Sequence, residues 1–113
     1  MKRVEKPWGY EVWWAVTDRY VGKILFVRSG QALSLQYHRE KAESMYCLSG
    51  RAQLTLGETT RPFVPGDAVD IPPGLVHRLE AVEDVTVVEV STPELDDVVR
   101  LEDRYGRQGT SNP

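Results

Sequence analysis

Short runs in which apolar and polar residues alternate recur along most of the chain, and Gly, Pro or charged residues separate them. A period of two residues, with Val, Ile, Thr and aromatic residues enriched, is typical of β-strands. Many short strands at regular spacing predict a closed or double-sheet β architecture in a single domain. The runs that we assign to strands are 10–16, 20–28, 33–38, 44–48, 51–56, 68–71, 77–81 and 85–90.

The two ends of the chain depart from this pattern. Three tryptophans fall within residues 8–14, and we expect this segment to be an arm whose aromatic rings cover the sheet rather than stack on a ligand. After the last strand, Thr92 followed by Pro93 is a sequence that can open a short helix. We expect residues 1–107 to form the domain with its aromatic arm, and residues 108–113 to be a disordered tail.

The run 33–38 has different chemistry on its two faces. Ser34, Gln36 and His38 share the face that we expect to point inward, whereas Leu33, Leu35 and Tyr37 share the other. Since that other face is apolar as well, something must cover it. Either the aromatic arm or a second subunit would do so, and we expect a homodimer.

Composition narrows the class of protein. The chain has 113 residues, a net charge of −3, one cysteine and no apolar run long enough to span a membrane. A negative net charge disfavours nucleic acid as a partner, because binding to a phosphate backbone needs a basic face. A single cysteine excludes an internal disulfide. We expect a cytoplasmic protein that binds neither membranes nor nucleic acids.

Both histidines of the chain lie in segments that a sheet can bring together. Gln36 and His38 point to one face, Glu43 returns on a neighbouring strand, and His77 follows the turn at residues 72–74. A lone histidine is usually a surface or core residue, but the spacing here favours a shared metal. Two imidazoles, a carboxylate and an amide oxygen suit Zn, and also Fe, Mn, Ni or Co.

The spacing G-x5-Q-x-H-x4-E-x6-G, followed by G-x5-P-x-G-x2-H, resembles the two motifs of the cupin superfamily. The resemblance implies an all-β, cupin-type double-stranded β-helix, which is a small jelly-roll barrel. Segments 6–9, 33–38, 71–80 and 97–107 more narrowly resemble the type II mannose-6-phosphate isomerases. In that family a similar domain forms the C-terminal part of bifunctional isomerase/guanylyltransferase enzymes. Because this chain has no room for the guanylyltransferase part, we expect only isomerase chemistry.

The resemblance implies that Gln36, His38, Glu43 and His77 bind the metal of an aldose–ketose isomerase that converts mannose 6-phosphate to fructose 6-phosphate. Since both histidines are then committed to the metal, a carboxylate or lysine must move the proton, and the candidates are Glu11, Lys23 and Glu40. The candidate donors to the substrate phosphate are Arg39, Lys41, Arg100 and Arg107. Lys41 stands where the family has an arginine.

Two other classes of function fit the same residues. His38, Glu43 and His77 also make the set of two histidines and one carboxylate that non-haem Fe(II) oxygenases use, so a small dioxygenase is an alternative. A sugar-binding cupin without catalytic activity is the other. A proton-transfer group close to the metal site would favour an isomerase over a binding module.

Overall fold

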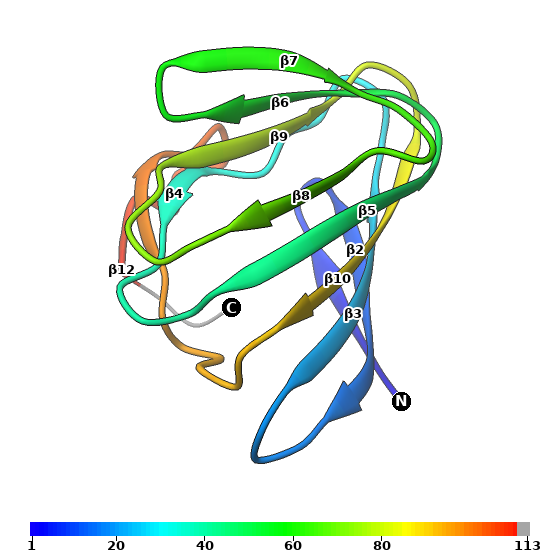
Figure 1. Cartoon of the computed structure of the whole chain (residues 1–113). Coiled ribbons are helices and arrows are strands. Elements are labelled where there is room, and N and C mark those ends of the chain that lie inside the picture. The colour runs from blue at the N-terminus through cyan, green and yellow to red at the C-terminus, as the bar shows by residue number, and fades with distance from the viewer. Residues whose placement is uncertain (111–113) are drawn as a thin grey trace.

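The computed structural model describes residues 1–110, which form twelve β-strands and no helix (Figure 1). Within this part of the chain there is therefore no helical segment capable of crossing a membrane. The strands are β1 (Lys2–Lys6), β2 (Gly9–Val16), β3 (Val21–Val27), β4 (Leu35–Tyr37), β5 (Glu43–Ser49), β6 (Ala52–Leu56), β7 (Thr59–Phe63), β8 (Ala68–Ile71), β9 (His77–Ala81), β10 (Val85–Ser91), β11 (Val99–Glu102) and β12 (Gly109–Thr110).

The strands form two six-stranded antiparallel sheets that face each other (Figure 1). The first sheet has the order β1-β2-β3-β10-β5-β8, and the second has the order β12-β11-β4-β9-β6-β7. From β4 onward the chain passes repeatedly from one sheet to the other. Residues distant in sequence therefore meet in the space between the sheets, as the predicted double-stranded β-helix requires.

The inward-facing side chains change from apolar to polar along the strands. In β10, Val85 and Val87 are buried in the apolar core, and Glu89 is buried on the same face two residues later. The interior is therefore divided into an apolar half and a polar half. Neighbouring strands show the same change from Leu25 to Lys23, from Met45 to Glu43 and from Leu79 to His77.

The apolar half contains the largest fully buried side chains, Phe63, Leu25 and Leu54. Complete burial of such a side chain contributes about 1.5–3 kcal/mol, so this half supplies most of the free energy that holds the sheets together. Trp8 belongs to the same cluster and is 2% exposed. Its position makes the first tryptophan a core residue.

The N-terminal segment differs from the arm that we expected, because β1 and β2 are themselves strands of the first sheet. Val4 lies opposite Glu11 in the β1–β2 pair, and β2 continues the sheet to β3. Trp14 is 45% exposed, and its ring lies over Gly22 on the outer surface. A side chain at position 22 would collide with that ring.

The helix predicted to start at Thr92 is wrong. The Thr92 hydroxyl oxygen accepts a hydrogen bond from the Ala42 N–H at 3.0 Å, and the Thr92 N–H donates to the Ala42 carbonyl at 3.0 Å. The atoms that would cap a helix are thus engaged by the start of β5. Gly109 and Thr110, which we assigned to a disordered tail, pair with β11; the rest of that tail, residues 111–113, lies outside the described residues.

Several widely exposed apolar side chains lie on the first sheet, whereas no residue of β4 is widely exposed. Leu33 is partly buried against the core, and Leu35 and Tyr37 are half-buried. By contrast, Tyr46, Leu48 and Val90 on the adjacent strands β5 and β10 are 46%, 55% and 48% exposed. The homodimer stays a prediction, and the surface best suited to it is the outer face of the first sheet.

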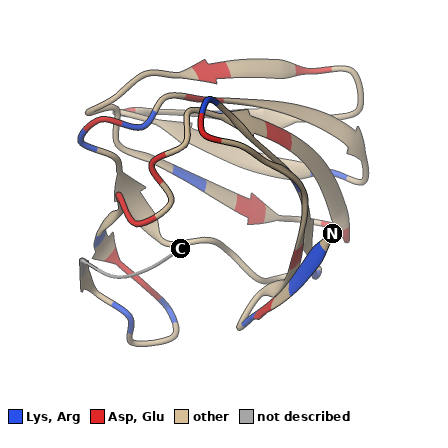
Figure 2. Ribbon diagram, turned by 90° about the horizontal axis from the view of Figure 1, so that it is seen from below, with Lys and Arg blue, Asp and Glu red and all other residues tan. Residues whose placement is uncertain are grey.

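Charged residues of both signs are spread along the strands and the loops that connect them (Figure 2). Basic and acidic segments alternate over short distances in this view. The buried charges are of more interest, because they gather in the polar half of the interior.

Candidate functional site

The predicted metal ligands come from both sheets and meet in the polar half of the interior. Gln36 on β4 lies directly opposite His77, the first residue of β9, in the second sheet. His38 follows β4, and Glu43 begins β5 in the facing sheet. The strand period places Ser34, Gln36 and His38 on the inward face, as the sequence predicted.

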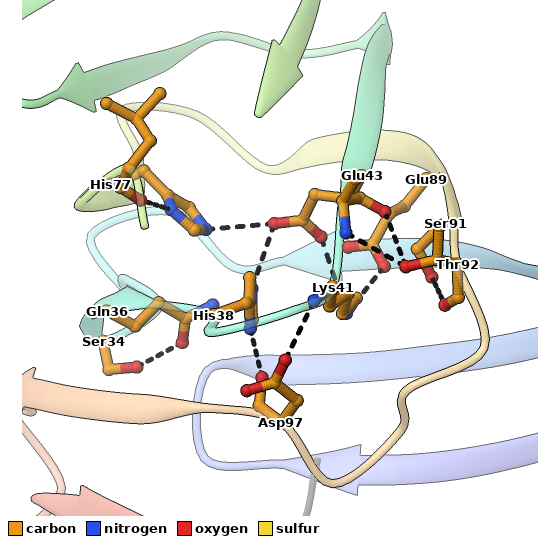
Figure 3. A network of polar contacts seen from close by, with 12 residues as sticks. Ser34, Gln36, His38, Lys41, Glu43, His77, Glu89, Ser91, Thr92 and Asp97 are labelled. Atoms are coloured by element: carbon orange, nitrogen blue, oxygen red, sulfur yellow. Dashed lines mark hydrogen bonds and ion pairs between the residues drawn. The ribbon is translucent and has the colours of Figure 1, made fainter. Parts of the chain in front are cut away.

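His38, Glu43 and His77 form a buried group that is suited to holding a metal ion. Their ligand atoms all lie within 4.8 Å of one another. The Oε1 atom of Glu43 is 3.3 Å from the Nε2 atom of His38 and 3.0 Å from that of His77 (Figure 3). The three side chains are almost fully enclosed, so a bound cation would be shielded from bulk water.

Backbone carbonyls fix the orientation of both imidazole rings. The Nδ1–H of His38 donates to the Asp97 carbonyl at 2.5 Å, and the Nδ1–H of His77 donates to the Leu75 carbonyl at 2.8 Å. Because a carbonyl oxygen can only accept, each Nδ1 carries a hydrogen; in the neutral ring each Nε2 then presents a lone pair, whereas in the imidazolium form it donates to Glu43. Both lone pairs face the Glu43 carboxylate.

This arrangement fits a divalent cation. The Nε2 atom of His77 is buried and has no hydrogen-bond partner among the described residues, although Glu43 lies beside it. Burial acts to raise the pKa of Glu43, but contacts with His38 and His77 and the charge of Lys41 outweigh it and hold this pKa well below its usual range. A carboxylate and two imidazole lone pairs directed at one point are the donor set of a metal centre.

The fourth predicted ligand, Gln36, lines the same cavity as His38 and Glu43. Its Oε1 atom accepts a hydrogen bond from the Ser34 hydroxyl at 2.5 Å (Figure 3). An amide oxygen has a second lone pair, so this hydrogen bond is compatible with metal binding and would orient the amide. The metal-ligand role of Gln36 stays a prediction.

A second buried carboxylate, Glu89, adjoins the group and was missed by the sequence analysis. The Lys41 ammonium lies 3.6 Å from Glu43 Oε2 and 3.5 Å from Glu89 Oε2. Burial and the nearby charge of Glu43 raise the pKa of Glu89 to about 7. The two-residue period of β10 could have revealed that Glu89 is buried, because it places Glu89 on the same face as Val85 and Val87.

Two of the predicted proton-transfer residues, Glu11 and Lys23, are buried and line the cavity. Lys23 Nζ lies 3.6 Å from Glu11 Oε1, and the same oxygen accepts a hydrogen bond from Trp13 Nε1–H at 2.7 Å. The Lys23 ammonium also lies 4.7 Å from the centre of the Trp13 ring. The half-buried tryptophan thus positions this ion pair.

Asp97 organises the turn that joins β4 to β5, a role that no local pattern in the sequence indicates. Its carboxylate accepts hydrogen bonds from the backbone N–H groups of Arg39, Glu40 and Lys41 at 2.9, 2.6 and 2.9 Å. Burial acts to raise the pKa of Asp97, but these three bonds lower it below its usual value. The same residue supplies the carbonyl that holds His38, so it fixes both the ligand and the turn.

The turn directs two of the predicted site residues away from the cavity. Arg39 and Glu40 are exposed and border a separate surface depression with Asp96 and Asp97. The predictions that Glu40 transfers the proton and that Arg39 binds phosphate therefore lack support from the geometry. The physical reason is that Asp97 binds the backbone of the turn, which leaves both side chains on the solvent side.

The remaining predicted residues, Lys41, Arg100 and Arg107, all line the cavity together with Gln36, His38 and Glu43. The cavity has a volume of about 50 Å³. This space holds an ion and a few waters, so most of a sugar would lie toward the opening. Lys6 and Trp8, to which the sequence analysis gave no site role, also line it.

A model of the mannose-6-phosphate isomerase C-terminal family matches residues 1–103. The chain belongs to this family. It is 35% identical over 111 residues to the xanthan biosynthesis protein XanB of Xanthomonas campestris, an alignment that covers 94% of this chain and 24% of XanB. It is 34% identical over 111 residues to the mannose-1-phosphate guanylyltransferase ManC of Salmonella typhimurium, covering 94% and 23% of the two chains. The chain thus spans about a quarter of the length of these relatives.

Solved structures support the fold. KdgF from a Halomonas species has a TM-score of 0.75 at 21% identity, over 83% of this chain and 89% of KdgF. A cupin superfamily protein from Desulfitobacterium hafniense has a TM-score of 0.67 at 17% identity, over 74% of its own length and 73% of this chain. A cupin sugar phosphate isomerase from Silicibacter pomeroyi scores 0.64 at 20% identity, over 73% of this chain and 56% of that one. The chain has the predicted cupin fold.

We expect His77→Ala to abolish tight metal binding, because only one imidazole and the Glu43 carboxylate of the close group remain. Elemental analysis of protein purified without added metal checks this. Cys47→Ala is the control, since Cys47 carries the single thiol of the chain and is buried in the apolar half. Full metal occupancy in a folded His77→Ala variant would contradict the site.

We expect Asp97→Ala to weaken metal binding by about 10- to 100-fold. Without its carboxylate, residue 97 is no longer anchored to the turn at residues 39–41, so its backbone carbonyl no longer holds His38 in place. A competition titration against a chelator measures the change. Asp96→Ala, which removes an exposed carboxylate one residue away, should leave the affinity unaltered. Equal affinities for the two variants would show that Asp97 does not position His38.

Proposed function

We propose that this chain is a metal-dependent aldose–ketose isomerase that acts on a sugar phosphate, with mannose 6-phosphate and fructose 6-phosphate as substrate and product. The observation that carries the proposal is that two members of the buried group of His38, Glu43 and His77, namely His38 and Glu43, line one cavity with further acidic and basic side chains. The family supports the same chemistry. Relatives named as mannose-1-phosphate guanylyltransferases support a sugar phosphate as the class of ligand.

The reaction needs two capacities at one place. The carbonyl must be polarised, and a proton must move between adjacent carbons of the open-chain sugar. His38, Glu43 and His77, with Gln36 as the fourth ligand, would hold the metal. When bound, a divalent ion supplies Lewis-acid polarisation of the carbonyl oxygen.

The proton must be moved by a side chain that the metal does not use. Glu11 and Glu89 are the carboxylates of the cavity, apart from Glu43, that are buried within it. Glu11 is held by Trp13 and paired with Lys23, so the pair offers a base and an acid side by side. Lys41 keeps the charges of Glu43 and Glu89 compensated and need not enter the reaction.

A low-polarity enclosure favours this chemistry. Trp8, Leu25 and Val98 form part of the cavity wall beside the charged residues. Electrostatic interactions are stronger where water is excluded, so preorganised charges there act more strongly on a developing negative charge than they would in bulk solvent.

The direct test is an isomerase assay with mannose 6-phosphate on protein stripped of metal and then supplied separately with Zn, Fe, Mn, Ni or Co. We expect turnover to return with at least one metal, and unphosphorylated mannose to be a poorer substrate. Binding of the sugar phosphate without turnover under every metal would instead indicate a sugar-binding module.

We expect Glu11→Gln or Glu89→Gln to lower kcat by about 10²- to 10⁴-fold while metal content stays unchanged, because removal of a general base costs that much. Glu40→Gln makes the same chemical change at an exposed residue outside the cavity and should leave kcat unaltered. If only Glu40→Gln lowered kcat, the assignment of the base to the cavity would be wrong.

A dioxygenase is the second candidate, because the close group contains two histidines and one carboxylate, as in non-haem Fe(II) oxygenases. Oxygen consumption by the Fe-loaded protein separates the two functions. An isomerase needs no oxygen, so Fe-dependent oxygen uptake coupled to substrate loss would favour the dioxygenase.

A further inference from the structure

The two oxygens of the Glu43 carboxylate have different neighbours. Oε1 faces the imidazoles, 3.3 Å from His38 Nε2 and 3.0 Å from His77 Nε2. Oε2 instead lies 3.6 Å from the ammonium of Lys41 (Figure 3). One oxygen of this carboxylate is therefore available to a metal ion held by the imidazoles, whereas a lysine engages the other.

The ammonium of Lys41 is held beside Oε2 by residues outside the metal-binding group. Its Nζ atom lies 3.5 Å from Oε2 of Glu89, which belongs to β10, the neighbour of β5 in the first sheet. The Lys41 backbone N–H donates to the Asp97 carboxylate at 2.9 Å. Lys41 is only 6% exposed. Burial acts to lower the pKa of Lys41, but the charges of Glu89 and Glu43 outweigh it and raise this pKa, so the ammonium stays charged.

This position makes Lys41 poorly suited to the phosphate contact predicted from the sequence. A phosphate within reach of its ammonium would meet the carboxylates of Glu43 and Glu89. Like charges at such distances repel strongly in a buried setting. The partners that the structure gives the Lys41 ammonium are these two carboxylates, and one of them is a predicted metal ligand.

A carboxylate can bind a metal ion through one oxygen or through both. The difference matters at a catalytic centre, because each protein donor occupies a position that water or substrate could otherwise take. The Lys41 ammonium opposes binding through both oxygens, since it competes for the lone pairs of Oε2 and repels a cation that approaches this oxygen. Oε1 has no ammonium beside it and is free of this competition.

We propose that Lys41 is a positioning residue that restricts Glu43 to one ligating oxygen, an inference that rests on the proposed function. Glu43 then binds the metal through Oε1, together with the imidazoles of His38 and His77. The position that Oε2 would have occupied stays open to a ligand. The proposed reaction uses such a position, because the substrate carbonyl oxygen must reach the metal.

Infrared difference spectra of the full chain, Zn-loaded minus metal-free, test this role. The asymmetric and symmetric stretching bands of a carboxylate are further apart when one oxygen binds a metal than when both do. We expect the wild type to show the larger separation and Lys41→Met, whose side chain is uncharged and of similar length, to show the smaller one. Lys41→Arg restores a cation beside Oε2 and should return the wild-type separation.

Lys23→Met is the matched control. It removes another buried ammonium from the same cavity, but Lys23 is paired with Glu11, which lies outside the close group of metal donors. The band separation in this variant should equal that of the wild type. If Lys41→Met fails to fold, the double variant Lys41→Met/Glu89→Gln takes its place, because it removes the ammonium together with its second carboxylate, and it should show the smaller separation.

The outcomes separate this inference from the proposed function. A wild type with the smaller separation, or with no metal-induced carboxylate band, would overturn the role of Lys41. An unaltered separation in the variants that lack the ammonium would overturn it as well. A larger separation that depends on Lys41, in a protein that isomerises no sugar, would refute the isomerase and support the positioning role. Turnover of mannose 6-phosphate by a wild type with the smaller separation would do the reverse.

Discussion

The burial of charged side chains between two sheets is the constraint on which the rest of the structure depends. An isolated carboxylate or ammonium taken out of water costs several kcal/mol, and the buried lysine and acidic side chains here each have an opposite charge beside them. Lys41 lies between Glu43 and Glu89, and Lys23 is paired with Glu11. Burial of the apolar half of the same interior offsets the desolvation cost of the charged groups in the polar half. The apolar side chains that stabilise the barrel and the charged side chains of the candidate site therefore lie at opposite ends of the same strands.

The site is rigid because its parts are tied across both sheets and across the chain. His38 and His77 are oriented through backbone carbonyls, and Glu43 reaches them from the facing sheet. Asp97 joins the connection between β10 and β11 to the turn between β4 and β5. One aspartate thus determines where a histidine points and which side chains of the turn face solvent. A metal centre needs such support, since small displacements of its ligands lower affinity.

The order of strands in the second sheet determines how the residues along the cavity are arranged. Across the second sheet the sequence of strands β9, β4 and β11 places His77, Gln36 and Arg100 in a row. His77 and Arg100 therefore lie on opposite sides of Gln36. A chain that spans about a quarter of its relatives forms this whole arrangement from its own residues.

The sequence by itself predicted eight of the twelve strands found in the described residues and the close group of His38, Glu43 and His77. Strand period is a local property, so the alternation through Ser34, Gln36 and His38 was enough to predict which side chains face inward. The donor chemistry of His38, Glu43 and His77 could likewise be read from residue type and spacing. Only the tertiary structure decided the roles of Asp97 and Glu89, and the outward direction of Arg39 and Glu40. These depend on contacts between segments more than forty residues apart, such as those from Lys41 to Asp97 and to Glu89. Whether a charged side chain is buried with a partner or left in solvent is settled by those contacts, and no local pattern in the chain records them.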